Sequence, residues 1–140
     1  AIGFTTCPDI CPMTMATFVA LHRRIDAAPG GQGPQFLLIS IDPDRDTPEM
    51  LAQYVRHFHP DFLGATGSDE VLRAVTRDLG GIYARVNDPK SALGYTMDHS
   101  ASIYLIDPDG QLAAIFSMPH DPAMMVRDFM ALVHAAGPQT

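Results

Sequence analysis

The sequence predicts an α/β fold in which a mixed central sheet is flanked by helices. Two observations indicate this class. Short apolar runs typical of buried strands alternate with segments of helical periodicity, and the chain closes with two strands around a tight turn and a last helix. A length of 140 residues supports one domain with an ordinary hydrophobic core. We therefore expect residues 1–140 to form a single domain.

The first half of the chain is expected to contain two strands and two helices. Residues 1–4 resemble the end of a buried strand, and residues 12–27 keep their apolar side chains at helical spacing. Residues 36–41 form a continuous apolar run, typical of a strand covered on both faces. A polar loop over residues 42–46 then leads to a helix over residues 47–58.

The second half has shorter elements. In chain order we expect a strand over 62–65, a helix capped at Ser68, a strand over 82–86, a polar stretch over 87–98, strands over 102–106 and 112–116, and a closing helix over 122–134. The segment Asp107-Pro108-Asp109-Gly110 has the composition of a hairpin turn, so the last two strands should pair antiparallel. This order of elements fits a thioredoxin-like layer fold.

Charge and hydropathy exclude several classes of function. The net charge is −7 and no basic residues cluster, so we expect no nucleic-acid partner, because a phosphate backbone would be repelled. No apolar run approaches the length of a bilayer span, and the sequence shows no signal peptide. Any attachment to a membrane is expected to come through an anchor that has been removed from this sequence.

The two cysteines stand together in Cys7-Pro8-Asp9-Ile10-Cys11-Pro12, where a strand should turn into the first helix. At this spacing a regular helical turn puts the two β-carbons about 5–6 Å apart. The sulfurs can then close to a disulfide or face one metal ion. The helix start favours thiolate over thiol, and thiolate is both the nucleophile of disulfide exchange and a ligand for Cu(I). The motif therefore supports redox chemistry and metal binding alike.

His99 is the residue expected to decide between these two chemistries. It ends the long polar stretch, immediately before the strand that leads to Ile106. Thioredoxin-type oxidoreductases resemble one another in keeping a proline at the corresponding strand entrance, whereas here no proline occurs between Pro89 and Pro108. An imidazole beside two thiolates gives two sulfur donors and one nitrogen donor. Such a site suits Cu(I), and it holds Cu(II) if a further ligand joins.

Three motifs in order resemble the SCO/SenC family of cytochrome c oxidase assembly proteins. They are Gly3-Phe4-Thr5-Thr6-Cys7-Pro8-Asp9-Ile10-Cys11-Pro12, Ser40-Ile41-Asp42-Pro43-Asp44-Arg45-Asp46-Thr47-Pro48, and Asp98-His99-Ser100 followed by Tyr104-Leu105-Ile106-Asp107-Pro108-Asp109-Gly110. The resemblance covers essentially the whole chain. It implies a thioredoxin-like fold and one copper ion, Cu(I) or Cu(II), held by Cys7, Cys11 and His99. It also implies delivery of that copper to the dinuclear site of cytochrome c oxidase subunit II.

The resemblance further implies the cellular setting. It implies a thioredoxin-like partner that keeps the cysteines reduced. It also implies a monomer anchored on the periplasmic side of the bacterial inner membrane or in the mitochondrial intermembrane space. Members of the family begin with a membrane anchor, a short hairpin and a full first core strand. These segments are missing before Ala1, so we expect the first strand to be clipped.

A thiol–disulfide oxidoreductase is the alternative function. The same cysteines would reduce the copper-site cysteines of subunit II, one as the nucleophile and the other as the resolving thiol. His99→Ala separates the two functions, because reductase activity should survive it and tight copper binding should not. A peroxidase ranks third, since no activating environment surrounds a single thiolate. We expect a metallochaperone rather than an enzyme.

The remaining histidines and the acidic loop are given other roles. Four histidines are expected on the solvated surface and a fifth, His120, is a minor candidate for the rim of the metal site; the four are His22, His57, His59 and His134. Asp42, Asp44 and Asp46 lack the glycine and glutamate of a calcium-binding EF-hand loop, so loop stiffening and helix capping explain them better. Asp42 is also a candidate to support a metal ligand by hydrogen bonding.

Methionines and zinc complete the alternatives. Met15, Met50, Met125 and Met130 are expected to fill the core, whereas Met97, two residues before His99, is a candidate for transient copper contact. A closed structural zinc site needs a fourth ligand that the sequence does not offer.

Overall fold

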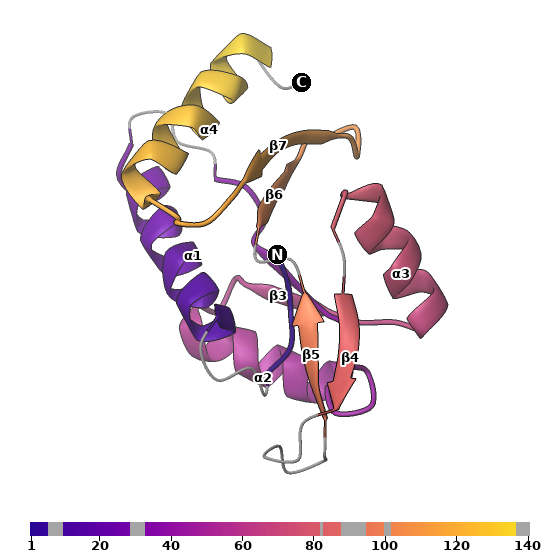
Figure 1. The fold of residues 1–140 in the computed structure, drawn as a ribbon. Coiled ribbons are helices and arrows are strands. Elements are labelled where there is room, and N and C mark those ends of the chain that lie inside the picture. Colours follow the sequence, from indigo (N-terminus) through magenta and orange to yellow (C-terminus); the bar gives the residue numbers. More distant parts are fainter. Residues whose placement is uncertain (6–9, 29–32, 82, 88–94, 100–101, 137–140) are drawn as a thin grey trace.

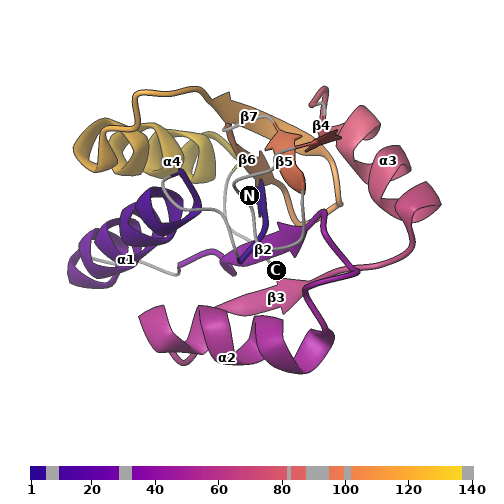
Figure 2. The same cartoon turned by 60° about the horizontal axis from the view of Figure 1, so that its bottom comes forward.

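The computed structural model describes residues 1–5, 10–28, 33–81, 83–87, 95–99 and 102–136. Helices α1 (Ile10–Ala27) and α4 (Pro122–Ala136) pack against each other on one side of the molecule (Figures 1 and 2). Helix α2 (Pro48–Phe58) covers β3 (Leu63–Ala65), and α3 (Asp69–Asp78) lies on the side away from α1 (Figure 2). Among these residues, no helix combines the length and the apolar character that a membrane span requires.

The strand that precedes the cysteine motif belongs to a parallel sheet. Its order is β1 (Ile2–Gly3), β2 (Leu37–Ser40), β3, with Ile2 opposite Ile39 and Leu38 opposite Gly64. Both residues of β1 are buried, which confirms the expected strand end at the start of the chain.

The other described strands form two antiparallel hairpins. One joins β4 (Tyr83–Asn87) to β5 (Tyr95–His99), and the other joins β6 (Ile103–Ile106) to β7 (Leu112–Phe116). The expected turn before β7 is confirmed, with Gly110 at a φ of 83°. Over the described ranges the strands therefore form one three-stranded parallel sheet and two separate two-stranded antiparallel sheets, rather than one continuous mixed sheet.

The prediction of a polar stretch through residue 98 is wrong for its last part. Residues 95–99 form β5, whose five residues pair with β4 from Asn87–Tyr95 to Tyr83–His99. Tyr95 and Met97 alternate with polar residues, which is the period-two pattern of a strand. Residues 88–94 lie outside the described part.

The predicted helix boundaries are largely confirmed, and local capping explains two of them. The Thr47 hydroxyl accepts a hydrogen bond from the Met50 N–H at 3.2 Å, and Ser68 accepts one from the Val71 N–H at 3.3 Å. Each cap satisfies one of the N–H groups that a helix start leaves without an internal partner.

The main core lies between α1, α2, α4 and the parallel sheet. Its buried members include Met15 at 0 % exposure, Phe18, Leu38 and Phe62. Met15 and Met125 confirm the predicted role of methionine as core filler, and Met130 is half-buried. The prediction is wrong for Met50, because half of this residue is exposed on the outer face of α2. A smaller cluster, formed by Ile2, Phe4, Ile41 and Leu72, joins the parallel strands to α3.

Candidate functional site

The cysteine motif lies between the end of β1 and the start of α1, as predicted. Cys11 is the second residue of α1. This first-turn position puts it beside the positive end of the helix, which favours thiolate. Cys7 and the side chain of Cys11 lie outside the described part of the structure.

A buried carboxylate fixes the chain just before this motif. Asp46 Oδ2 accepts a hydrogen bond from the backbone N–H of Thr5 at 3.0 Å, and Asp46 Oδ1 accepts a second from the Thr5 hydroxyl. The Ser40 hydroxyl, at the end of β2, donates a third to Oδ2 at 2.6 Å. Asp46 is 1 % exposed and Ser40 is fully buried.

These three donors explain why a carboxylate can be buried here. A buried charge is costly unless hydrogen bonds satisfy it, and charge-assisted hydrogen bonds are among the strongest in proteins. Asp46 therefore joins the end of β2 to Thr5, two residues before Cys7. This result confirms the predicted loop-stiffening role of the acidic segment, whereas helix capping is performed by Thr47.

Asp42 and Arg45 form a second buried group in the same loop. Arg45 Nε donates to Asp42 Oδ2, and their side chains are 9 % and 1 % exposed. The Arg45 guanidinium also lies over the ring of Phe4, 5.8 Å from its centroid. Phe4 precedes Thr5, so this ion pair packs against the same short segment that Asp46 holds. Hydrogen bonding of Asp42 to a metal ligand stays a prediction.

His99 is the last residue of β5, where its backbone lies opposite Tyr83. In Figure 1 the β5 arrow points toward the N-terminus of the chain. Strand β1 runs the other way, from the N-terminus toward the start of α1. The side chains of His99 and Met97 lie outside the described part. The convergence of the imidazole with the two sulfurs is therefore carried forward as a prediction.

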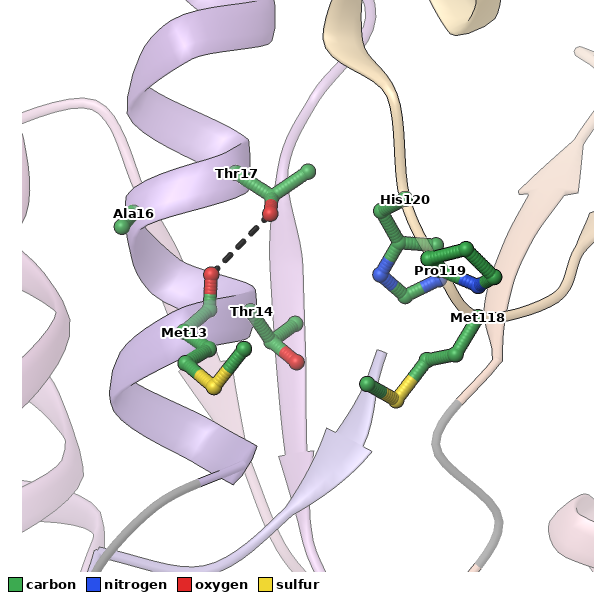
Figure 3. A pocket seen from close by; sticks show the side chains of 7 residues that line it. All are labelled: Met13, Thr14, Ala16, Thr17, Met118, Pro119 and His120. Carbon is green, nitrogen blue, oxygen red and sulfur yellow. Dashed lines mark hydrogen bonds between the residues drawn. The ribbon is translucent and has the colours of Figure 1, made fainter.

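His120 lines a cavity of about 340 Å³ between α1 and the segment before α4. Figure 3 shows the thioethers of Met13 and Met118 directed into the same space. One ring nitrogen of His120, Nε2, is 2.9 Å from the carbonyl oxygen of Phe116. Since a carbonyl only accepts, Nε2 is the donor in this hydrogen bond. A contact between His120 and the copper stays a prediction.

Two of the histidines expected on the solvated surface are instead half-buried. His22 and His59 stack with ring centroids 4.0 Å apart, and His59 lies 5.1 Å from the ring of Phe62. The residues are distant in the sequence and meet only because α1 and α2 pack together, so spacing alone gave no signal. His57 and His134 are exposed, as predicted.

Comparison with known proteins decides the family. The family model described as SCO1/SenC matches residues 1–134. The chain belongs to the SCO1/SenC family. An SCO2-like protein of Rickettsia felis is 40 % identical over 125 residues, covering 86 % of this chain and 58 % of the relative. The mitochondrial SCO2 homolog of Bos taurus is 42 % identical over 115 residues, covering 82 % of this chain and 43 % of the relative. The chain thus spans about half the length of these relatives.

Solved SCO structures confirm the thioredoxin-like fold. Arabidopsis thaliana ScoI with copper bound superposes with a TM-score of 0.87 at 30 % identity, covering 96 % of this chain and 81 % of that one. Yeast Sco1 with copper bound gives a TM-score of 0.82 at 29 % identity, covering 99 % and 75 %. A SCO1/SenC family lipoprotein from Bacillus anthracis gives 0.76 at 26 % identity, covering 94 % and 77 %.

Proposed function

We propose that this chain is a copper metallochaperone that binds one copper ion through Cys7, Cys11 and His99. The observation that carries the proposal is the cysteine motif at the start of α1, in a chain that matches the SCO1/SenC family over residues 1–134. Two thiolates and one imidazole are a donor set that fits Cu(I). The copper-bound plant and yeast relatives support the same ion.

The proposed recipient is the dinuclear copper site of cytochrome c oxidase subunit II. Copper would pass by exchange between similar soft donors, so the transfer needs no activation of the ion. The proposed location is the compartment that this site faces, the bacterial periplasm or the mitochondrial intermembrane space. Mitochondrial relatives and a bacterial lipoprotein in the family support this setting. We further propose that the chain acts as a single-domain monomer.

Loading couples copper binding to the redox state of the cysteines, because only the reduced thiols can form the ligands. A thioredoxin-like reductant is the proposed partner that keeps them reduced. The Asp46 network supports this chemistry by holding Thr5 in place while the following residues change between disulfide, dithiol and copper-bound forms.

Copper titration of the reduced protein tests the proposal. We expect one equivalent of Cu(I) to be held against a competing chelator, and Cys11→Ser or His99→Ala to abolish this tight binding. His57→Ala is the matched control, because His57 is exposed on α2. Undiminished Cu(I) affinity in both site variants would refute the proposed ligand set.

A thiol–disulfide oxidoreductase is the second candidate, favoured by the place of Cys11 in the first turn of α1. One thiolate would attack the target disulfide and form a mixed disulfide, and the second would displace the target as a dithiol. The chain would end as the disulfide and need two electrons from the reductant. Reduction of a disulfide substrate at a rate that His99→Ala does not change, together with weak copper binding, would favour this function.

A further inference from the structure

A second group of metal-ligating side chains lies at the interface of α1 and α2. It is formed by His22 of α1 with His59 and Asp61 of the turn after α2. One ring nitrogen of each histidine and one carboxylate oxygen of Asp61 lie within 4.8 Å of one another. The histidines are half-buried and Asp61 is exposed.

Aromatic packing holds the two imidazoles in place. The His22 ring lies 5.9 Å from Phe36 and 6.0 Å from Phe62, measured between ring centroids. His59 is the C-cap residue of α2, and its backbone N–H donates to the Val55 carbonyl at 3.2 Å. Both rings are therefore positioned by packed structure before any ion arrives, which lowers the entropic cost of binding.

Each ring offers one nitrogen to an ion, and for His59 this costs a hydrogen bond. His22 Nδ1 lies 3.2 Å from Asp26 Oδ2, so Nδ1 is the donor to this carboxylate and Nε2 is the nitrogen that faces an ion. A carboxylate behind an imidazole is the arrangement that orients histidine ligands in metal sites. His59 Nδ1 accepts a hydrogen bond from the Asp61 N–H at 3.1 Å, so a cation bound at this nitrogen would take the place of that donor.

We propose that His22, His59 and Asp61 form a binding site for a divalent first-row cation, with Cu(II) the tightest-bound. Two imidazoles and a carboxylate are borderline and hard donors, which suit Cu(II), Ni(II) or Zn(II) rather than Cu(I), and Cu(II) heads the affinity order. Metal–ligand bonds of about 2.0–2.2 Å require the donor atoms to draw closer. The exposed Asp61 side chain can rotate to close the site, and water completes the coordination.

The site is separate from the cysteine motif. His22 lies eleven residues beyond Cys11 on the same helix, which corresponds to about 16 Å of helical rise. The proposal therefore stands whether or not Cys7, Cys11 and His99 deliver copper. It gives the chain two metal sites of opposite preference, one soft and sulfur-rich, the other nitrogen- and oxygen-based.

The test is a Cu(II) titration of the whole chain, without a histidine tag, carrying Cys7→Ser and Cys11→Ser so that thiolates neither bind nor reduce the ion. We expect one equivalent of Cu(II) with the electron paramagnetic resonance of nitrogen coordination. In this background His22→Gln or His59→Gln should weaken Cu(II) binding by at least roughly tenfold. The control variant His57→Gln should leave it unchanged.

Asp61→Asn keeps the test decisive if a histidine variant fails to fold. The Asp61 backbone bonds to Gln35 and His59 do not involve its side chain, so this change preserves the turn while removing the anionic ligand. We expect several-fold weaker Cu(II) binding with unchanged thermal unfolding of the metal-free protein. Equal Cu(II) affinity in the folded parent, His22→Gln and Asp61→Asn proteins would overturn the proposal. Loss of the nitrogen signal in His99→Ala or His57→Gln instead would also overturn it.

Discussion

Asp46 and Thr5, 41 residues apart in the sequence, are joined by two hydrogen bonds, one from the Thr5 backbone and one from its hydroxyl. The carboxylate is buried, and its third donor is Ser40 at the end of the central strand β2. The segment that leads into the cysteine motif is thus fixed, through the Asp46 carboxylate, to the end of β2.

We expect Asp46→Asn to lower both stability and copper affinity. Asparagine can keep one oxygen for the Thr5 N–H and the Ser40 hydroxyl, but its neutral amide replaces charge-assisted hydrogen bonds with weaker ones, at a cost of about 1–3 kcal/mol. Urea unfolding measures the stability and chelator competition measures Cu(I) affinity. Asp128→Asn, on the exposed face of α4, is the control. A variant that unfolds at the same urea concentration as the parent would argue against the Asp46 network.

Two methionines of α1 differ in burial and should therefore differ in their contribution to stability. Met15 is fully buried and Met13 is 58 % exposed, so the same truncation should have different consequences. Met15→Ala is expected to lower the free energy of unfolding by about 2–5 kcal/mol, because it removes buried surface and leaves a cavity. Met13→Ala should change it by less than about 0.5 kcal/mol. Equal unfolding midpoints for the two variants would contradict this placement of α1.

A side chain at Gly64 of β3 is expected to destabilise the fold. A β-carbon there would lie 3.1 Å from Leu51 Cβ and 3.4 Å from the Leu51 carbonyl oxygen. Gly64→Ala should therefore push α2 away from the sheet and cost about 1–3 kcal/mol. At Gly67 a β-carbon would meet only Val71 side-chain atoms at 3.7–3.8 Å. Gly67→Ala should therefore be tolerated, and it is the matched control. Thermal unfolding of both proteins checks the difference, and an unaffected Gly64→Ala protein would contradict this packing.

Breaking the buried ion pair should be more damaging than removing it. Arg45→Met leaves Asp42 as a buried charge without its guanidinium partner, which is expected to cost about 3–5 kcal/mol. The double variant Arg45→Met, Asp42→Leu should recover a large part of that loss, because no charge is then buried. A double variant that is no more stable than the single one would show that the pair is not coupled in this way. Chemical unfolding of the parent, the two single variants and the double variant gives the coupling free energy between Arg45 and Asp42.

Most elements of this fold could be predicted because each has a local signal. The apolar run around Leu38 and the serine before Asp69 each specify a strand or a helix start within a few residues. Strand β5 was missed because residues 87–98 form a polar stretch with Pro89 and Gly94, although Tyr95 and Met97 alternate with polar residues.

The long-range contacts could not be predicted from spacing. Neither the burial of Asp46 nor the stacking of His22 on His59 has a signature in the sequence, since each depends on segments that meet only in three dimensions. The cysteine motif was recognisable because its two reactive side chains lie four residues apart. The distant His99 entered only through the family resemblance and the missing proline.

X-ray absorption at the copper edge of the reduced, Cu(I)-loaded protein tests the central claim most directly. The proposed site predicts two sulfur ligands and one nitrogen ligand on each copper, with the nitrogen lost in His99→Ala. A spectrum with sulfur ligands alone in the parent protein, unchanged by His99→Ala, would contradict a site completed by that imidazole.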